Sequence, residues 1–144
     1  MIYFYRIAHF LYKLKIPLLP KIIYYLQFLL FNSSVPPSVE IGKGTKFAYG
    51  GIGVVIHARA KIGNNCIIGQ GITIGGKSKI YDVPVIGNKV FISSGVRILG
   101  DIKIGSNVII GANSVVVKNI ESNNMVAGVP AKVIRTNIMF DNYV

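Results

Sequence analysis

Aliphatic residues recur at every sixth position through the middle of the chain. The series holds for eleven consecutive positions, all Ile or Val: Ile56, Ile62, Ile68, Ile74, Ile80, Ile86, Ile92, Ile98, Ile104, Ile110 and Val116. A period of six fits neither the 3.6-residue period of an α-helix nor the two-residue alternation of a half-buried strand. It is typical of a short strand and a turn, repeated as in a parallel β-helix, where stacked repeats bury a core that one repeat could not bury alone.

Three such repeats complete one triangular coil, so side chains one coil apart are predicted to stack in columns. The first predicted column is Ile56, Ile74, Ile92 and Ile110, and the second is Ile62, Ile80, Ile98 and Val116. Glycine follows many of these positions and suits the corners, where the backbone often needs a positive φ. The same period begins earlier, at Val35, Ile41 and Phe47, in an offset register.

Two stretches interrupt the period. The first is residues 48–55, directly before His57, and the second is residues 77–84, which follow Gly75 and Gly76. We interpret residues 77–84 as an outward loop, although Ile80 keeps the count of six. Breaks in a strict repeat are where function is usually located.

The first 31 residues follow a helical pattern instead. Pro17 and Pro20 divide them into two short helices, and Arg6, His9 and Lys13 fall on one stripe of the first. Neither piece is long enough to span a bilayer, and there is no signal-peptide cleavage pattern. The sequence therefore divides into a helical appendage and linker (1–34), a β-helix (35–134) and a tail (135–144), with Met125 to Val133 adding a strand.

Two compatible roles for the appendage stay open. It could cap the open end of the β-helix or contact another subunit. It could also attach peripherally to the inner membrane face, because Arg6, Lys13, Lys15 and Lys21 occur among 39 residues without an acid.

Charge and cysteine content narrow the partners and the compartment. The 144 residues include 16 Lys and Arg against 5 Asp and Glu, a net charge of +11, which indicates an anionic partner. Nucleic acid is disfavoured because the chain has no basic run and no recognised binding motif. The single Cys66 takes an inward position as a small hydrophobic residue, and no disulfide can form within the chain. A reducing compartment such as the cytoplasm is therefore expected.

Five segments together resemble the hexapeptide-repeat acyltransferases, in particular the serine acetyltransferase-like branch found in surface-polysaccharide biosynthesis. They are Ile41-Gly-Lys-Gly, Gly53-Val-Val-Ile-His57, the run from Ile62 to Gly76, Pro84-Val-Ile-Gly and the run from Ala127 to Lys132. The resemblance implies a mainly β, left-handed parallel β-helix, a homotrimer, and acetyl-CoA bound in a groove between subunits. It also implies a histidine that acts as general base on the acceptor.

His57 is the candidate base. The chain has two histidines, and His9 lies in the helical appendage. Histidine suits proton abstraction because its unperturbed pKa is near neutrality. The alternative is a solvated corner residue, since His57 takes a position that glycine occupies in most neighbouring repeats.

The acceptor is predicted from where the chain departs from the family. Serine acetyltransferases carry an Asp-His pair where this chain has Ala48 and Tyr49, and a later histidine where it has Val83. The first expectation is therefore O-acetylation of a sugar or polysaccharide precursor. Serine O-acetylation, sugar N-acetylation and a non-catalytic trimeric scaffold remain alternatives. Tyr49 and Asp82 are candidate acceptor-binding residues, and Asp82 is also a candidate to orient the base.

For acetyl-CoA, small residues would let the pantetheine arm approach the backbone, and basic residues near the C-terminal end would meet the phosphates. The candidates are Gly75, Gly76, Ser93, Gly95, Gly111 and Ala112, followed by Lys118, Lys132 and Arg135. A zinc hydratase of the same fold is excluded, because it needs three histidine ligands and the chain has two histidines. No metal is expected.

Overall fold

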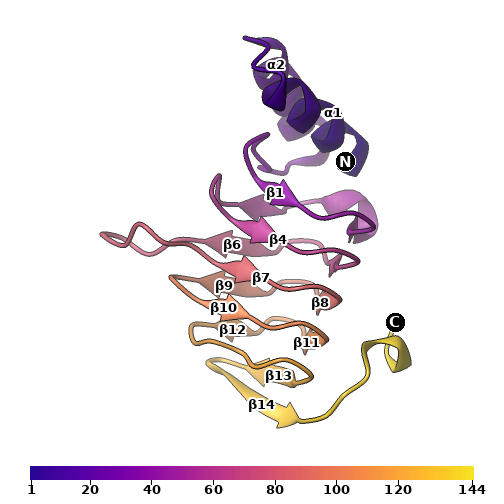
Figure 1. Cartoon of the computed structure of the whole chain (residues 1–144), viewed down its shortest axis with the longest axis vertical. Coiled ribbons are helices and arrows are strands. Elements are labelled where there is room, and N and C mark those ends of the chain that lie inside the picture. The colour runs from indigo at the N-terminus through magenta and orange to yellow at the C-terminus, as the bar shows by residue number, and fades with distance from the viewer.

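The computed structural model describes residues 1–144 and shows a column of stacked three-sided coils with a helical hairpin over its N-terminal end (Figure 1). The hairpin comprises α1 (Ile2–Lys13) and α2 (Leu19–Phe31). The first sheet comprises β1 (Glu40–Ile41), β4 (Lys61–Ile62), β7 (Val85–Ile86) and β10 (Lys103–Ile104). The second comprises β2 (Lys46–Phe47), β5 (Ile67–Ile68), β8 (Val90–Ile92), β11 (Val108–Ile110), β13 (Met125–Gly128) and β14 (Ala131–Arg135). The third comprises β3 (Val55–Ile56), β6 (Thr73–Gly75), β9 (Arg97–Leu99) and β12 (Val115–Val116).

All strand pairs within the column are parallel, as the hexad predicts. The exception lies at the C-terminal end, where β13 and β14 pair antiparallel. The sequence predicted one strand from Met125 to Val133, but the chain reverses direction there at Val129–Pro130. The inward aliphatic side chains form one buried cluster through the column, so the core is a stack of ladders.

The first predicted column is only half right. Ile56 stacks on Ile74 as expected, but the next partner of Ile74 is Ile98 rather than Ile92. Ile92 lies instead in the second sheet, between Ile68 and Ile110. The third sheet therefore carries the ladder from Ile56 to Val116, which the sequence had divided between two columns.

The second predicted column is also half right: Ile98 stacks on Val116 as expected, but Ile62 and Ile80 do not join them. Ile62 stacks on Ile86, and Ile80 is 41% exposed in the connection between β6 and β7. Figure 1 shows this connection protruding from the column, which confirms the predicted outward loop at residues 77–84. The loop occupies one repeat length, so the count of six continues while every later residue moves to another side of the triangle.

The polar side chains of the hairpin bind the first coil. The Tyr5 hydroxyl donates to the Val39 carbonyl oxygen at 2.6 Å, and the Arg6 guanidinium donates to the Ile41 carbonyl oxygen at 2.7 Å. His9 Nδ1 lies 2.7 Å from the Pro37 carbonyl oxygen, so the hairpin caps the open end of the β-helix. Arg6, predicted as a membrane contact, is thus already engaged within the chain.

Two further features complete the column. Residues 48–51 form a short 3-10 turn, η1 (Ala48–Gly51), which is the first break in the period. The C-terminal tail folds back along the column: Ile138 and Phe140 are buried, and Asp141 forms an ion pair with Lys89 at 3.2 Å. Neither helix of the hairpin has the length and apolar content needed to cross a bilayer.

Cys66 is fully buried, as its inward position predicted, and its Sγ donates to the Gly87 carbonyl oxygen at 3.2 Å. Burial raises the pKa of the thiol, which reduces the thiolate that reacts with disulfide reagents. We expect modification of Cys66 in the native protein to be at least about a hundredfold slower than in the urea-unfolded chain. Absorbance on reaction with an aromatic disulfide measures this, and equal rates in both states would contradict a buried thiol.

Candidate active site

The candidate active site lies at the corner that follows the third sheet. His57 comes directly after β3, and its N–H donates to the Ile74 carbonyl oxygen at 2.8 Å. Gly75, the last residue of β6, pairs with Leu99 at the end of β9. His57, Gly75 and Leu99 therefore stack at the same corner. Because the first predicted column joined Ile56 and Ile74 to Ile92 and Ile110, the residues that follow the last two, Ser93 and Gly111, were expected at this corner as well. That expectation is wrong, since the 77–84 loop shifts the later residues.

The imidazole of His57 packs against Gly76. A Cβ placed on Gly76 would lie 3.9 Å from His57 Nε2 and 3.3 Å from Val83 Cγ1, so the missing side chain leaves room beside the ring. His57 Nδ1 accepts the backbone N–H of Arg59 at 3.2 Å. In a neutral ring this contact assigns the proton to Nε2. For Nε2 to act as a base, the ring must adopt the other tautomer, with its proton on Nδ1. That change ends the hydrogen bond from the Arg59 N–H.

A cavity of about 680 Å³ opens beside Gly76, between the protruding loop and the corner after β9. Its lining is Gly76, Lys77, Ser78, Ile80, Leu99, Gly100, Asp101, Ile102 and Val117. The volume falls within the range of small-molecule sites. The backbone N–H of Gly76 donates no hydrogen bond within the chain, so it is available to a ligand.

Arg59 and Tyr81 hold the base of the loop to the first corner. Arg59 Cζ lies 4.1 Å from the centroid of the Tyr81 ring, and its Nη2 donates to the Tyr81 carbonyl oxygen. A cation over an aromatic face within about 6 Å is attractive. The sequence pattern did not predict this pair, which lines a cavity separate from the one beside Gly76.

Asp82 lies in a second, smaller cavity of about 260 Å³, together with Arg59 and Tyr81. It forms no hydrogen bond to His57, whose Nδ1 is held by the Arg59 backbone instead. Tyr49 lies in η1, is 75% exposed and lines no cavity. Neither predicted acceptor-binding residue therefore forms a hydrogen bond to the candidate base.

The residues predicted to bind acetyl-CoA divide between the two edges of the third sheet. Gly75 and Gly76 lie at the edge that carries His57, and Lys118 follows β12 at the same edge. The remaining small residues precede β9 and β12 at the opposite edge: Ser93, Gly95, Gly111 and Ala112.

Lys132 lies in β14 and pairs with Ala127, at the C-terminal end of the column. The chain contains two ion pairs, Lys61 with Glu40 and Lys89 with Asp141, so neither Lys118 nor Lys132 is neutralised by a carboxylate. Arg135 donates to the Tyr143 hydroxyl at 3.2 Å and is partly engaged by the tail.

Comparison with known proteins identifies the family of this fold. The model of the bacterial transferase hexapeptide (six repeats) matches residues 84–118. The serine acetyltransferase of Synechococcus elongatus is 39% identical over 139 residues, which cover 94% of this chain and 57% of the relative. That of Bacillus subtilis is 36% identical over 138 residues, covering 94% and 63%. The chain is a hexapeptide-repeat protein of the serine acetyltransferase-like group. It spans less than two thirds of the length of these relatives.

Solved serine acetyltransferases share the fold of this hexapeptide-repeat protein. The Neisseria gonorrhoeae enzyme in complex with serine superimposes with a TM-score of 0.86 at 36% identity, covering 93% of this chain and 55% of that one. The Brucella abortus enzyme in complex with coenzyme A gives 0.84 at 35% identity, covering 96% and 56%. The likeness confirms the predicted left-handed β-helix. The predicted sugar or polysaccharide acceptor finds no support here, and the serine alternative is favoured.

Proposed function

We propose that this chain transfers the acetyl group of acetyl-CoA to the hydroxyl of L-serine, with His57 as general base. The observation that carries the proposal is the position of His57 beside Gly76, which lines a cavity of about 680 Å³. The chain has this site in a fold that it shares with enzymes solved with serine and with coenzyme A.

In the proposed reaction His57 takes up one proton and later releases it. Acetyl-CoA supplies an acetyl group activated as a thioester. His57 Nε2 removes the hydroxyl proton as the serine oxygen forms a bond to the acetyl carbon, and the bond from that carbon to sulfur breaks. The imidazolium then returns its proton to the departing thiolate, so that O-acetylserine and free CoA are the products. The Gly76 N–H, which is free within the chain, is placed to donate to the developing oxyanion.

Donor binding would use the edge of the third sheet that carries His57. Gly76 leaves space for a thioester arm beside His57, whereas Gly95 and Gly111 at the other edge are packed closely against Asn113 and Ala127 of the next coil. Lys118 and Lys132, which no carboxylate neutralises, would meet the phosphates at the C-terminal end. We assign this role to the β-helix of residues 35–134, and propose that a homotrimer closes the groove at its subunit boundaries.

A sugar hydroxyl is the second candidate acceptor. Serine acetyltransferases were expected to carry histidines at two positions where this chain has other residues. These residues are Val83, which is buried, and Tyr49, which is exposed. The loss of both histidines would change the part of the site that binds the acceptor, which is why an acceptor other than serine is considered.

The test is an acceptor panel assayed by release of the CoA thiol. With acetyl-CoA fixed, kcat/KM for L-serine should exceed that for free sugars and nucleotide sugars by about a hundredfold or more, because a site built for hydrogen bonds rejects ligands that leave them unmade. A higher kcat/KM for a sugar than for L-serine would favour the sugar hydroxyl as the acceptor. Binding of acetyl-CoA by calorimetry without turnover on any acceptor would indicate a non-catalytic scaffold.

A further inference from the structure

The helical hairpin is apolar on the outside and polar on the inside. Tyr5, Arg6 and His9 direct their polar groups at the first coil. Large apolar side chains face outward along both helices: Tyr3, Ile7, Phe10, Leu14, Ile22, Tyr25, Leu26, Phe28, Leu29 and Leu30 are all exposed. Soluble monomers rarely expose a contiguous apolar surface of this kind, and such a surface marks contact with protein or membrane.

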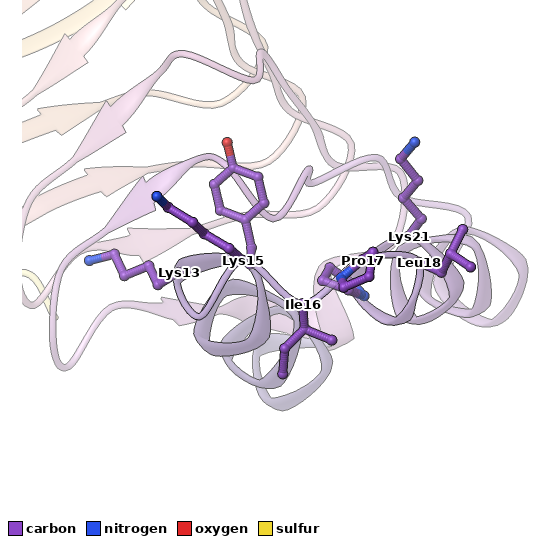
Figure 2. Close-up of a pocket in the computed structure, with 8 residues that line it drawn as sticks. Lys13, Lys15, Ile16, Pro17, Leu18 and Lys21 are labelled. Atoms are coloured by element: carbon purple, nitrogen blue, oxygen red, sulfur yellow. The ribbon is translucent and has the colours of Figure 1, made fainter.

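Lysines surround the tip of the hairpin. A cavity of about 570 Å³ at the turn between the helices is lined by Tyr12, Lys13, Lys15, Ile16, Pro17, Leu18, Pro20 and Lys21. Figure 2 shows Lys13 and Lys15 at one end of this turn and Lys21 at the other, with Ile16 directed away from the three ammonium groups. None of the three lysines forms an ion pair.

The turn itself projects an apolar side chain. Leu18 has φ 67° and ψ −50°, and the Leu19 N–H donates to the Pro17 carbonyl oxygen at 2.7 Å. These values describe a classic γ-turn centred on Leu18, a rare and strained conformation. Its side chain is 71% exposed, and in sequence Leu18 falls between Lys15 and Lys21.

We propose that the hairpin docks on an anionic phospholipid surface, with Ile16 and Leu18 inserted below the headgroups and Lys13, Lys15 and Lys21 bound to lipid phosphates. An interfacial helix pair with apolar residues on its outer face and lysines at its margin has the composition that lies in the plane of such a surface. Long lysine side chains reach back to the phosphates while their stems contact the acyl region. This site is independent of acetyl transfer at His57.

Charge decides between a membrane and a second copy of the chain. The protein carries a net charge of +11, and its first acid is Glu40. Two hairpins packed tip to tip would place lysines against lysines without a carboxylate to separate them. An anionic bilayer offers the complementary charge, and each basic residue near its surface strengthens binding.

Flotation of the full chain with lipid vesicles tests the proposal. We expect retention on phosphatidylcholine vesicles that contain about one third phosphatidylglycerol, and little retention on phosphatidylcholine alone. The triple variant Lys13→Gln, Lys15→Gln and Lys21→Gln should weaken apparent binding by about tenfold or more. Ile16→Ser combined with Leu18→Ser should weaken it by a similar factor, because the apolar contribution is lost.

The matched control removes the same charge from the β-helix: Lys43→Gln, Lys46→Gln and Lys103→Gln, three exposed lysines outside the hairpin. We expect it to weaken binding by less than about twofold. Equal losses in the two triple variants would overturn the proposal, since net charge alone would then explain binding. Failure of anionic vesicles to retain the unmodified chain would overturn it as well. So would sedimentation of a larger assembly that the Ile16 and Leu18 substitutions dissociate, because the tip would then face another copy.

Discussion

Replacing His57 with Asn is expected to lower kcat for acetyl transfer by about a hundredfold or more, because the variant loses the group that removes the acceptor proton. Asn retains hydrogen-bonding atoms of similar reach without a basic nitrogen. Steady-state release of the CoA thiol at saturating acetyl-CoA measures the loss.

The other histidine supplies the matched control. His9 contacts the Pro37 carbonyl oxygen in the N-terminal cap, far along the chain from the candidate site. His9→Asn should leave kcat within about twofold of the unmodified protein. If His57→Asn retained full turnover, or if both variants lost activity equally, His57 would not be the base.

Truncating Ile98 to Ala is expected to lower the free energy of unfolding by about 2–5 kcal/mol, whereas Ile80→Ala should change it by no more than about 0.5 kcal/mol. Ile98 is fully buried in the ladder between Ile74 and Val116. Ile80 is 41% exposed in the protruding loop. Urea unfolding at one protein concentration measures both values, and the concentration is held fixed because the proposed homotrimer would make apparent stability depend on it.

The pair tests the register of the coil. The uninterrupted count of six assigned Ile80 and Ile98 to one inward column, which predicts similar losses for both. A large loss of stability in Ile80→Ala would therefore indicate that the 77–84 loop is packed in the core. A small loss at Ile98 would contradict the observed ladder of the third sheet.

The sequence predicted the coil but not which side each residue occupies. Period six identifies a repeating strand and turn, and the observed parallel ladders confirm it. Ile74 and Ile86 are two repeats apart, yet they lie on successive sides of the triangle, as residues one repeat apart normally do. The loop uses the extra repeat length. A loop of one repeat length leaves the count unchanged, so periodicity alone does not reveal the displacement.

The candidate site was predictable to the same degree. His57 followed from the scarcity of histidines, and Gly75 and Gly76 followed from their position before the loop. The contact between Arg59 and Tyr81 joins residues 22 apart, a separation set by the loop's path and by no local pattern. Arg6 illustrates the opposite error, since a basic residue on an amphipathic stripe suggested a lipid contact and instead binds the backbone of the first coil.

The proposed active site requires donor, base and glycine edge to meet at one corner. A crystal structure of the protein bound to CoA tests this most directly. We predict the CoA sulfur beside His57, placed so that an acceptor oxygen hydrogen-bonded to Nε2 would come within about 3–3.5 Å of the acetyl carbon that this sulfur carries. The pantetheine arm should lie beside Gly75 and Gly76, with a second copy closing the groove. CoA bound elsewhere on the column, with its sulfur remote from His57, would contradict the assignment of the active site.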